Sequence, residues 1–284
     1  MNHLVFIIMD SCRYDAVVAA RTPTLDALGT VEARWSYASW TAPSHHAMLM
    51  GLLPHRAPRE TFAAEVYRGD LLRWRDRLDM PELQLRTFVP TLNLPGVLRR
   101  AGYRTHGLVS LPVLNPYTTM ATGFDEYRLW PTHADFAGMI DHILTTGFDE
   151  PRFWFLNLGE THYPYMLDAG RDLPHLSGVH GVFRRIDESD ADADAPRFFD
   201  APTLDRLRAQ QVRCVEHLDA QFARLFPALP DNTWLIVTAD HGELFGEDGY
   251  FGHGPMTHPK VFEVPFIEGR VRALHRRAGP AASP

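Results

Sequence analysis

The sequence predicts an α/β fold, with a mostly parallel central sheet that carries helices on both faces. Two short apolar runs, 4–9 and 234–237, lead directly into carboxylates, as strands buried on both faces of a parallel sheet often do. Strand and helix patterns alternate along the chain, which is the order expected of parallel strands joined by helices. With 284 residues, the chain is long enough to bury a core as one large domain.

The other elements follow from apolar periodicity and from the residues that begin and end helices. Thr22 and Pro23 begin a helix that Gly29 ends, and a short helix lies between Trp40 and Gly51. The remaining predictions are, in chain order, a helix at 92–101, strands at 105–110 and 153–158, a helix at 204–226 and a strand at 262–267.

A single catalytic domain is predicted over residues 1–270, with two surface or lid segments. Segment 57–90 is charged and rich in Arg, and we expect a surface helix and loop that cover the site. Segment 184–202 is acidic and alternates Asp with Ala in part, which is typical of a solvated loop or lid. Residues 271–284 are rich in Arg, Ala, Gly and Pro and are expected to form a flexible tail.

The composition excludes several classes of partner. The formal net charge of −7 argues against a nucleic-acid or anionic-membrane surface, so the expected partner is a small anionic substrate drawn to a local positive centre. The apolar runs are too short to span a bilayer, and no leader pattern precedes the first strand, so a cytoplasmic location is expected. Cys12 and Cys214 are too few for a disulfide framework and are expected to be buried. The sequence leaves open whether the protein forms a homo-oligomer.

The carboxylates Asp10 and Asp240 are predicted to meet at one edge of the sheet, because ligands bind outside the carboxyl ends of parallel strands. His241 follows Asp240, and carboxylate and imidazole groups are suitable ligands for a divalent metal. Thr41 stands where a helix begins, and a metal-bound hydroxyl there becomes a usable nucleophile. The predicted metal ligands are Asp10, Thr41, Asp240 and His241. With histidines at hand, Zn²⁺ or Mn²⁺ is favoured over Mg²⁺ or Ca²⁺.

Two further histidines complete the predicted site. His162 comes soon after the strand at 153–158, and His253 lies between two glycines. Each is expected to bind the anionic oxygens of the substrate, to protonate the leaving group, or to hold a second metal ion. The plain alternatives are a turn residue and a loop residue, and His258 is a weaker candidate nearby.

Taken together, these motifs resemble the sulfatase branch of the alkaline phosphatase superfamily, up to about Glu268. Each motif alone is weak, but five or more in the family's order and spacing are a strong signal. The resemblance implies a three-layer α/β/α sandwich and a divalent metal. It rests on segments 10–15, 22–26, 41–45, 51–55, 101–105, 123–125, 162–165, 238–249 and 253–254.

The departures from the family pattern point away from sulfate esters. Sulfatases carry a Cys or Ser that is converted to formylglycine, whereas Thr41 cannot be converted and resembles the nucleophile of the phosphoryl-transferring branches. The resemblance therefore implies a metal-dependent hydrolase of phosphate or phosphonate esters with a covalent intermediate on Thr41. The alternatives are a phosphoryl-group transferase or other metal-dependent catalyst, a sulfate-ester hydrolase, and a degenerate binding protein, which Ser11 and His45 motivate.

The resemblance also implies substrate contacts. His45 stands where sulfatases carry the Arg of their signature, so it is expected to bind substrate. Arg13 is expected to pair with a nearby carboxylate, with a phosphate contact as the alternative. Glu243 and Glu247 are expected either to orient His241 or to be exposed acids.

Overall fold

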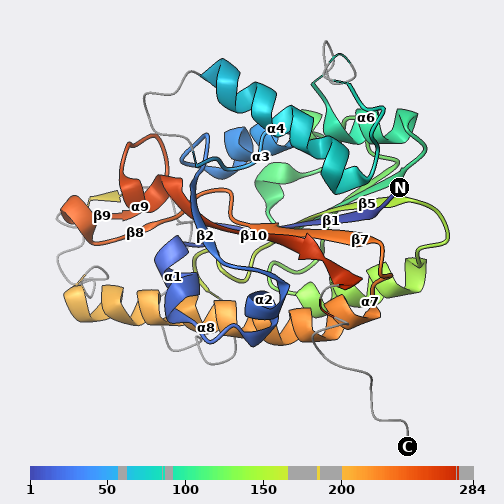
Figure 1. Ribbon diagram of the computed structural model, residues 1–284. Helices are drawn as coiled ribbons and strands as arrows, with labels where there is room; N and C mark the ends of the chain where they lie inside the picture. The colour runs from blue at the N-terminus through green and yellow to red at the C-terminus, as the bar shows by residue number, and fades with distance from the viewer. Residues whose placement is uncertain are drawn as a thin grey trace, which may run out of the picture.

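The computed structural model describes residues 1–56, 63–84, 86, 92–165, 184–185, 200–272 and 274. Its centre is a seven-stranded sheet in the order β2-β10-β7-β1-β5-β3-β4 (Figure 1). The seven strands are β1 (His3–Met9), β2 (Glu32–Trp35), β3 (Arg104–Val109), β4 (Glu126–Leu129), β5 (Arg152–Leu158), β7 (Thr233–Thr238) and β10 (Glu263–Arg270). A second, three-stranded sheet contains β6 (Arg184–Arg185), β9 (Tyr250–Gly252) and β8 (Leu244–Phe245).

The predicted fold class is confirmed. Strand β1 pairs in parallel with β5 and β7, and β3 pairs in parallel with β5 and β4. Only β10 runs antiparallel to its neighbours in this sheet, which are β7 and β2. The sheet is therefore mostly parallel, with the antiparallel pairing at one side.

Helices cover both faces of this sheet, as Figure 1 shows. One face carries α1 (Tyr14–Ala19), α2 (Pro23–Leu28), α7 (Phe136–Thr146) and α8 (Ala201–Leu225). The other carries α3 (Thr41–Leu49), α4 (Ala63–Leu78) and α6 (Leu94–Arg100), and the short helix α9 (Pro259–Phe262) precedes β10. The single-turn helices are η1 (Pro112–Leu114), η2 (Thr119–Ala121), η4 (Phe226–Ala228) and η5 (Glu247–Gly249).

Strand β1 contributes to both hydrophobic cores. Val5, Ile7 and Met9 pack in the core with α2, α7 and α8. The alternate residues Leu4, Phe6 and Ile8 pack in the core with α3, α4 and α6. Successive strand side chains point to opposite faces, so a continuous apolar run is what a strand between two helical layers requires.

The Arg-rich segment 57–90 contains a helix, as predicted, but that helix is part of the core. Leu71, Trp74 and Leu78 of α4 are buried, and the Trp74 indole N–H donates to Gly51 O at 2.8 Å. Charged residues occupy the remaining face of α4, which is why the segment reads as surface. The rest of the predicted covering loop, at 57–62, 85 and 87–90, lies outside the described residues.

Two other predicted segments are described only in part. Within the acidic segment 184–202, residues 186–199 lie outside the described residues, and 201–202 already begin α8. The predicted tail starts too early at 271, because Val271 is fully buried and packs in the core. Residues 275–284 lie outside the described residues. Of the helices in the described parts of the chain, none combines the length and apolarity needed to cross a bilayer.

Candidate metal centre and nucleophile

The register of three central strands places the chemistry at one edge of the sheet. Met9 pairs with Leu158 of β5, and Ile8 pairs with Thr238 of β7. Asp10 directly follows β1, and Asp240 follows β7 by two residues. Parallel strands end at the same edge, so both carboxylates reach one place, as predicted.

The two fully buried carboxylates are joined through the backbone. Ser11 N donates to Asp240 Oδ1 at 3.1 Å, a contact between residues 229 positions apart. Ser11 has a positive φ of 58°, a conformation that few residues other than glycine adopt, and its carbonyl accepts from Gln211 Nε2 of α8 at 2.9 Å. Helix α8 therefore holds a strained turn that brings the Asp10 segment against Asp240.

His241 lies between the other predicted ligands. Its Nε2 is 3.3 Å from Thr41 Oγ1, 3.3 Å from Asp240 Oδ2 and 4.0 Å from Asp10 Oδ1. Its Nδ1 is 2.9 Å from Gly242 O, an acceptor, so the proton sits on Nδ1 and Nε2 keeps its lone pair. The four predicted ligands are therefore brought together.

Thr41 is the first residue of α3, and Trp40 before it is extended. The helix N-terminus has free N–H groups and a partial positive charge, which favours an anionic oxygen at this position. Ser44 of the same helix donates to Ala38 O at 3.1 Å and lies 3.2 Å from Ser36 Oγ, which in turn donates to Asp240 O. These hydroxyls connect the start of α3 to the segment that carries Asp240.

The residues fit a divalent cation. Asp240 Oδ2 is buried and has no hydrogen-bond partner among the described residues, which is costly unless something else binds it. Around it stand a second carboxylate, an imidazole lone pair and a hydroxyl, which is a donor set suited to Zn²⁺ or Mn²⁺.

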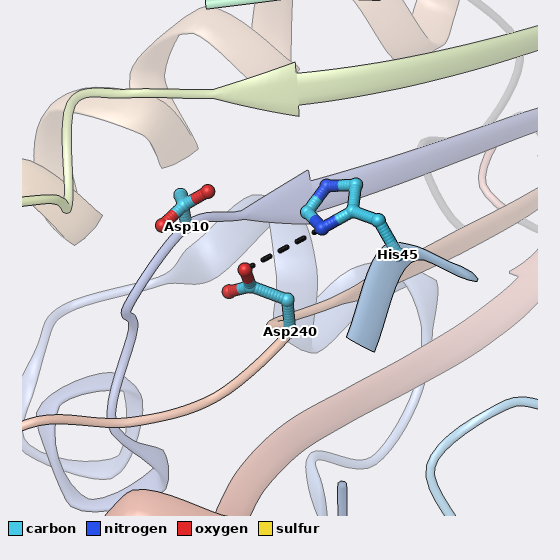
Figure 2. Close-up of side chains that lie close together, drawn as sticks. All are labelled: Asp10, His45 and Asp240. Carbon is cyan, nitrogen blue, oxygen red and sulfur yellow. Dashed lines mark ion pairs between the residues drawn. The ribbon is translucent and has the colours of Figure 1, made fainter. Parts of the chain in front are cut away.

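His45 joins the two carboxylates from α3, and Figure 2 shows the three side chains facing one another. One ligand atom from each of Asp10, His45 and Asp240 lies within 4.8 Å of the others. The imidazole Nδ1 is 2.9 Å from Thr41 O and 3.5 Å from Asp240 Oδ2, and Nε2 is 3.2 Å from Asn157 Nδ2. Since protein groups already meet both ring nitrogens, this geometry favours a positioning role. The substrate contact expected from the sequence stays a prediction.

Asn157 is a site residue that the sequence analysis missed. It lies next to the end of β5, where its Nδ2 donates to Asp10 Oδ2 at 2.7 Å. Its Oδ1 accepts from the backbone of Ser110 and Leu111, both at 3.2 Å. An amide inside an otherwise apolar buried strand is a readable signal, because a buried polar group needs partners.

The predicted histidines also converge. His162 Nε2 is 4.0 Å from Asp10 Oδ1, and the His162 ring is 5.4 Å from the His253 ring. The His253 ring is in turn 4.3 Å from that of His241. His258 is different, because its Nδ1 accepts from Lys260 N at the start of α9 and its Nε2 faces Asp248.

Arg13 pairs with carboxylates, the first of its two predicted roles. It makes ion pairs of 2.6 Å with Asp15 and with Glu247, and its side chain is only 2% exposed. Its Nη1 also donates to Glu243 O at 3.2 Å. Glu247 is therefore an ion-pair partner of Arg13, and the phosphate contact of Arg13 stays a prediction.

Burial controls the charges of the site. It raises the pKa of Asp10 to about 6 and that of Asp240 to about 7, and for Asp10 the neighbouring Asp240 charge adds to the effect. Burial also lowers the pKa of His45 and of His241 to about 4, so both rings are neutral at pH 7. A cation therefore competes with protons for the carboxylates and not for the His241 lone pair.

Metal affinity should depend steeply on pH. Since Asp10 and Asp240 must lose their protons to bind a cation, we expect the association constant for Zn²⁺ to rise about 10²- to 10³-fold from pH 5 to pH 8. Competition with a chromogenic chelator of known proton affinity measures this. The rise should level off above the higher of the two pKa values, and a flat profile would contradict the proposed ligands.

A helix that begins at Thr41 and two strand-end carboxylates lie at one edge of the mostly parallel sheet, which is the arrangement expected of an alkaline-phosphatase-like fold. The family model described as Sulfatase matches residues 2–268. The chain therefore belongs to the sulfatase family, as the motifs implied. No curated protein sequence matches it.

Solved structures agree on the fold at low sequence identity. Phosphonate monoester hydrolase of Agrobacterium radiobacter is 17% identical, with a TM-score of 0.62 over 94% of this chain and 68% of that one. The C-terminal periplasmic domain of EptC from Escherichia coli is 16% identical, with a TM-score of 0.59 over 99% of this chain and 76% of that one. A structure of that domain in complex with Zn has a TM-score of 0.58 and 16% identity over the same shares of both chains. Because EptC is represented by a periplasmic domain, these neighbours give no support to a cytoplasmic location.

Proposed function

We propose that this protein is a metal-dependent hydrolase that cleaves phosphate or phosphonate esters through a covalent intermediate on Thr41. The observation that carries the proposal is the position of Thr41 Oγ1, at a helix N-terminus and 3.3 Å from His241 Nε2, beside two buried carboxylates. The phosphonate monoester hydrolase among the structural neighbours supports the substrate class.

Asp10, Asp240, His241 and Thr41 would hold the cation. When bound, the cation supplies positive charge that polarises a phosphoryl oxygen and favours the ionised Thr41 hydroxyl. The neighbour solved with Zn supports Zn²⁺ as the first ion to test, with Mn²⁺ next. As an alternative to binding the substrate or protonating the leaving group, His162 and His253 would hold a second ion.

The chain's own residues account for the group transfer. Thr41 Oγ attacks phosphorus in line in its ionised form, the bond to the leaving alcohol breaks, and the leaving oxygen takes a proton from the protonated ring of His253 or His162. Water then gives one proton back to that histidine and attacks phosphorus, and the bond to Thr41 breaks so that Thr41 leaves in its ionised form. The buried N-terminus of α3 stabilises the negative oxygens during both steps.

A substrate comparison tests this function. The protein loaded in turn with Zn²⁺, Mn²⁺ and Mg²⁺ is assayed on p-nitrophenyl phosphate, bis(p-nitrophenyl) phosphate, p-nitrophenyl phenylphosphonate and p-nitrophenyl sulfate. We expect a phosphorus ester to be cleaved at least about tenfold faster than the sulfate, and a chelator to abolish turnover. Preference for the sulfate, or no turnover with any metal, would contradict the proposal.

A phosphoryl-group transferase is the second candidate, and the phosphoethanolamine transferase neighbours favour it. The same covalent intermediate would then pass to an alcohol and not to water. Product analysis with and without an added alcohol such as ethanolamine separates the two, because only a transferase makes the phospho-alcohol at a rate comparable to hydrolysis.

A further inference from the structure

Glu243 contacts His253, whereas the sequence analysis expected it either to orient His241 or to be an exposed acid. Its Oε1 is 3.2 Å from His253 Nδ1, and its Oε2 accepts a hydrogen bond from the Tyr165 hydroxyl. Glu243 and Tyr165 are fully buried, and the His253 side chain is 8% exposed. Both carboxylate oxygens are thus engaged, one by the tyrosine and one by the histidine.

The hydrogen bonds around His253 define which ring nitrogen carries a proton. Besides Glu243, the neighbour of Nδ1 is Ser11 Oγ at 3.5 Å. The Ser11 hydroxyl donates its single hydrogen to Asp10 Oδ1 at 3.3 Å, so towards His253 it can only accept. Since both neighbours of Nδ1 are acceptors, Nδ1 carries the proton. Nε2 takes no hydrogen bond from the described residues, so it is the ring nitrogen that remains available to a substrate.

The backbone around Glu243 and Tyr165 is built to hold this arrangement. Tyr165 has a positive φ of 56°, which costs energy for a large side chain, and its carbonyl accepts from Gln210 Nε2 of α8 at 3.2 Å. Glu243 O accepts from Arg13 Nη1 at 3.2 Å. Between His241 and Glu243, a Cβ on Gly242 would come within 2.1 Å of Lys260 O, so only glycine allows this close approach.

We propose that Glu243 and Tyr165 are positioning residues that hold a proton on Nδ1 of His253 and direct its Nε2 at the leaving-group oxygen. The leaving oxygen takes a second proton, carried on Nε2, which water returns in the hydrolysis step. Tyr165 holds the Glu243 carboxylate in place, and the carboxylate in turn holds the His253 ring. An acid–base histidine is commonly oriented by a third group in this way. The kinetic part rests on the proposed function, whereas the position of the ring proton is independent of it.

The ring proton is read by nitrogen NMR. In the protein labelled with ¹⁵N-histidine, with the His253 resonance assigned from His253→Gln, we expect a proton on Nδ1 at pH 8. An unprotonated Nδ1 would overturn the proposal whether or not any substrate turns over. A protonated Nδ1 in a protein that cleaves no phosphorus or sulfur ester would leave the geometry standing and refute the proposed function alone.

The kinetic test compares leaving groups. A p-nitrophenolate ion leaves without a proton, whereas an alkoxide needs one, so Glu243→Gln should lower kcat for an alkyl ester about 10²- to 10³-fold. The loss on the p-nitrophenyl ester of the same acid should stay below about tenfold, with KM nearly unchanged on both. Tyr165→Phe should show the same selectivity with a smaller loss.

Two variants control for the loss of a buried polar group. Glu160 is 1% exposed and its Oε1 accepts from Phe136 N at 2.8 Å, and the Tyr103 hydroxyl donates to Asn2 O at 2.6 Å. Glu160→Gln and Tyr103→Phe should leave the ratio of alkyl to p-nitrophenyl rates as in the wild type. Equal losses on both esters in Glu243→Gln would indicate a purely structural role and overturn the proposal.

Discussion

Replacing Thr41 by Ala is expected to lower kcat by about 10⁴- to 10⁶-fold, because alanine has no hydroxyl to form the covalent intermediate. The rate that remains should come only from binding of the substrate and from the positive charge of the cation that polarises it. Steady-state kinetics on the best phosphorus ester, with metal content measured in parallel, gives the value. Thr41→Ser keeps the hydroxyl and should retain turnover within about 10²-fold of the wild type.

Direct detection of the covalent intermediate is a second test of the Thr41→Ala variant. Acid quenching of the wild type during turnover, followed by intact-mass measurement, should show one added phosphoryl group that maps to Thr41 and that Thr41→Ala lacks. Thr233→Val is the matched control, because Thr233 is a buried threonine at the opposite end of β7. Near-normal turnover in Thr41→Ala would refute the nucleophile.

Replacing Asp240 by Asn is expected to weaken metal binding by at least about 10³-fold, more than the 10- to 100-fold typical of residues that only orient ligands. Its Oδ2 has no hydrogen-bond partner among the described residues, and its histidine neighbours His45 and His241 are neutral at pH 7, so we expect the charge to be needed for a cation more than for the fold. Activity should fall in proportion to occupancy. Isothermal titration with Zn²⁺ and metal analysis after dialysis measure the loss.

For the stability of the metal-free protein, we expect no loss in the Asp240→Asn variant. Asp10 and Asp240 repel each other in a buried site, so removing one charge should leave the melting temperature at pH 8 unchanged or higher. Asp248→Asn is the control, because the Asp248 side chain is 74% exposed and should affect neither quantity. A large loss of stability without metal would show that Asp240 serves the fold instead.

The sequence predicted the central strands and the convergence of Asp10, Thr41, Asp240 and His241. These follow from local patterns, since a buried strand is continuously apolar and its last residues are polar. Strands β2 and β4 and helix α7 were not predicted. Both strands are short, partly exposed and placed at the edges of the sheet, where side-chain patterns are weakest.

The contacts of the site could be predicted only in part. Nothing in the local sequence says that Glu243 meets Tyr165, which is 78 positions away, or that Asn157 lies between Asp10 and His45. Such pairings depend on how segments pack in three dimensions. The sequence pattern did place Glu243 close to His241, a predicted metal ligand, and the structure shows that its carboxylate contacts His253.

The two strands that lead to the aspartates are hydrogen-bonded neighbours, yet they lie far apart in the sequence, since 229 positions separate Ser11 from Asp240. A nascent chain still lacking β7 has an incomplete ligand set and an unpaired edge on β1. During translation the protein should therefore neither capture a cation at this site nor attack an ester until the segment that carries Asp240 and His241 has emerged from the ribosome. Strand β10 follows that segment in the chain, so the ligand set is complete before the central sheet is.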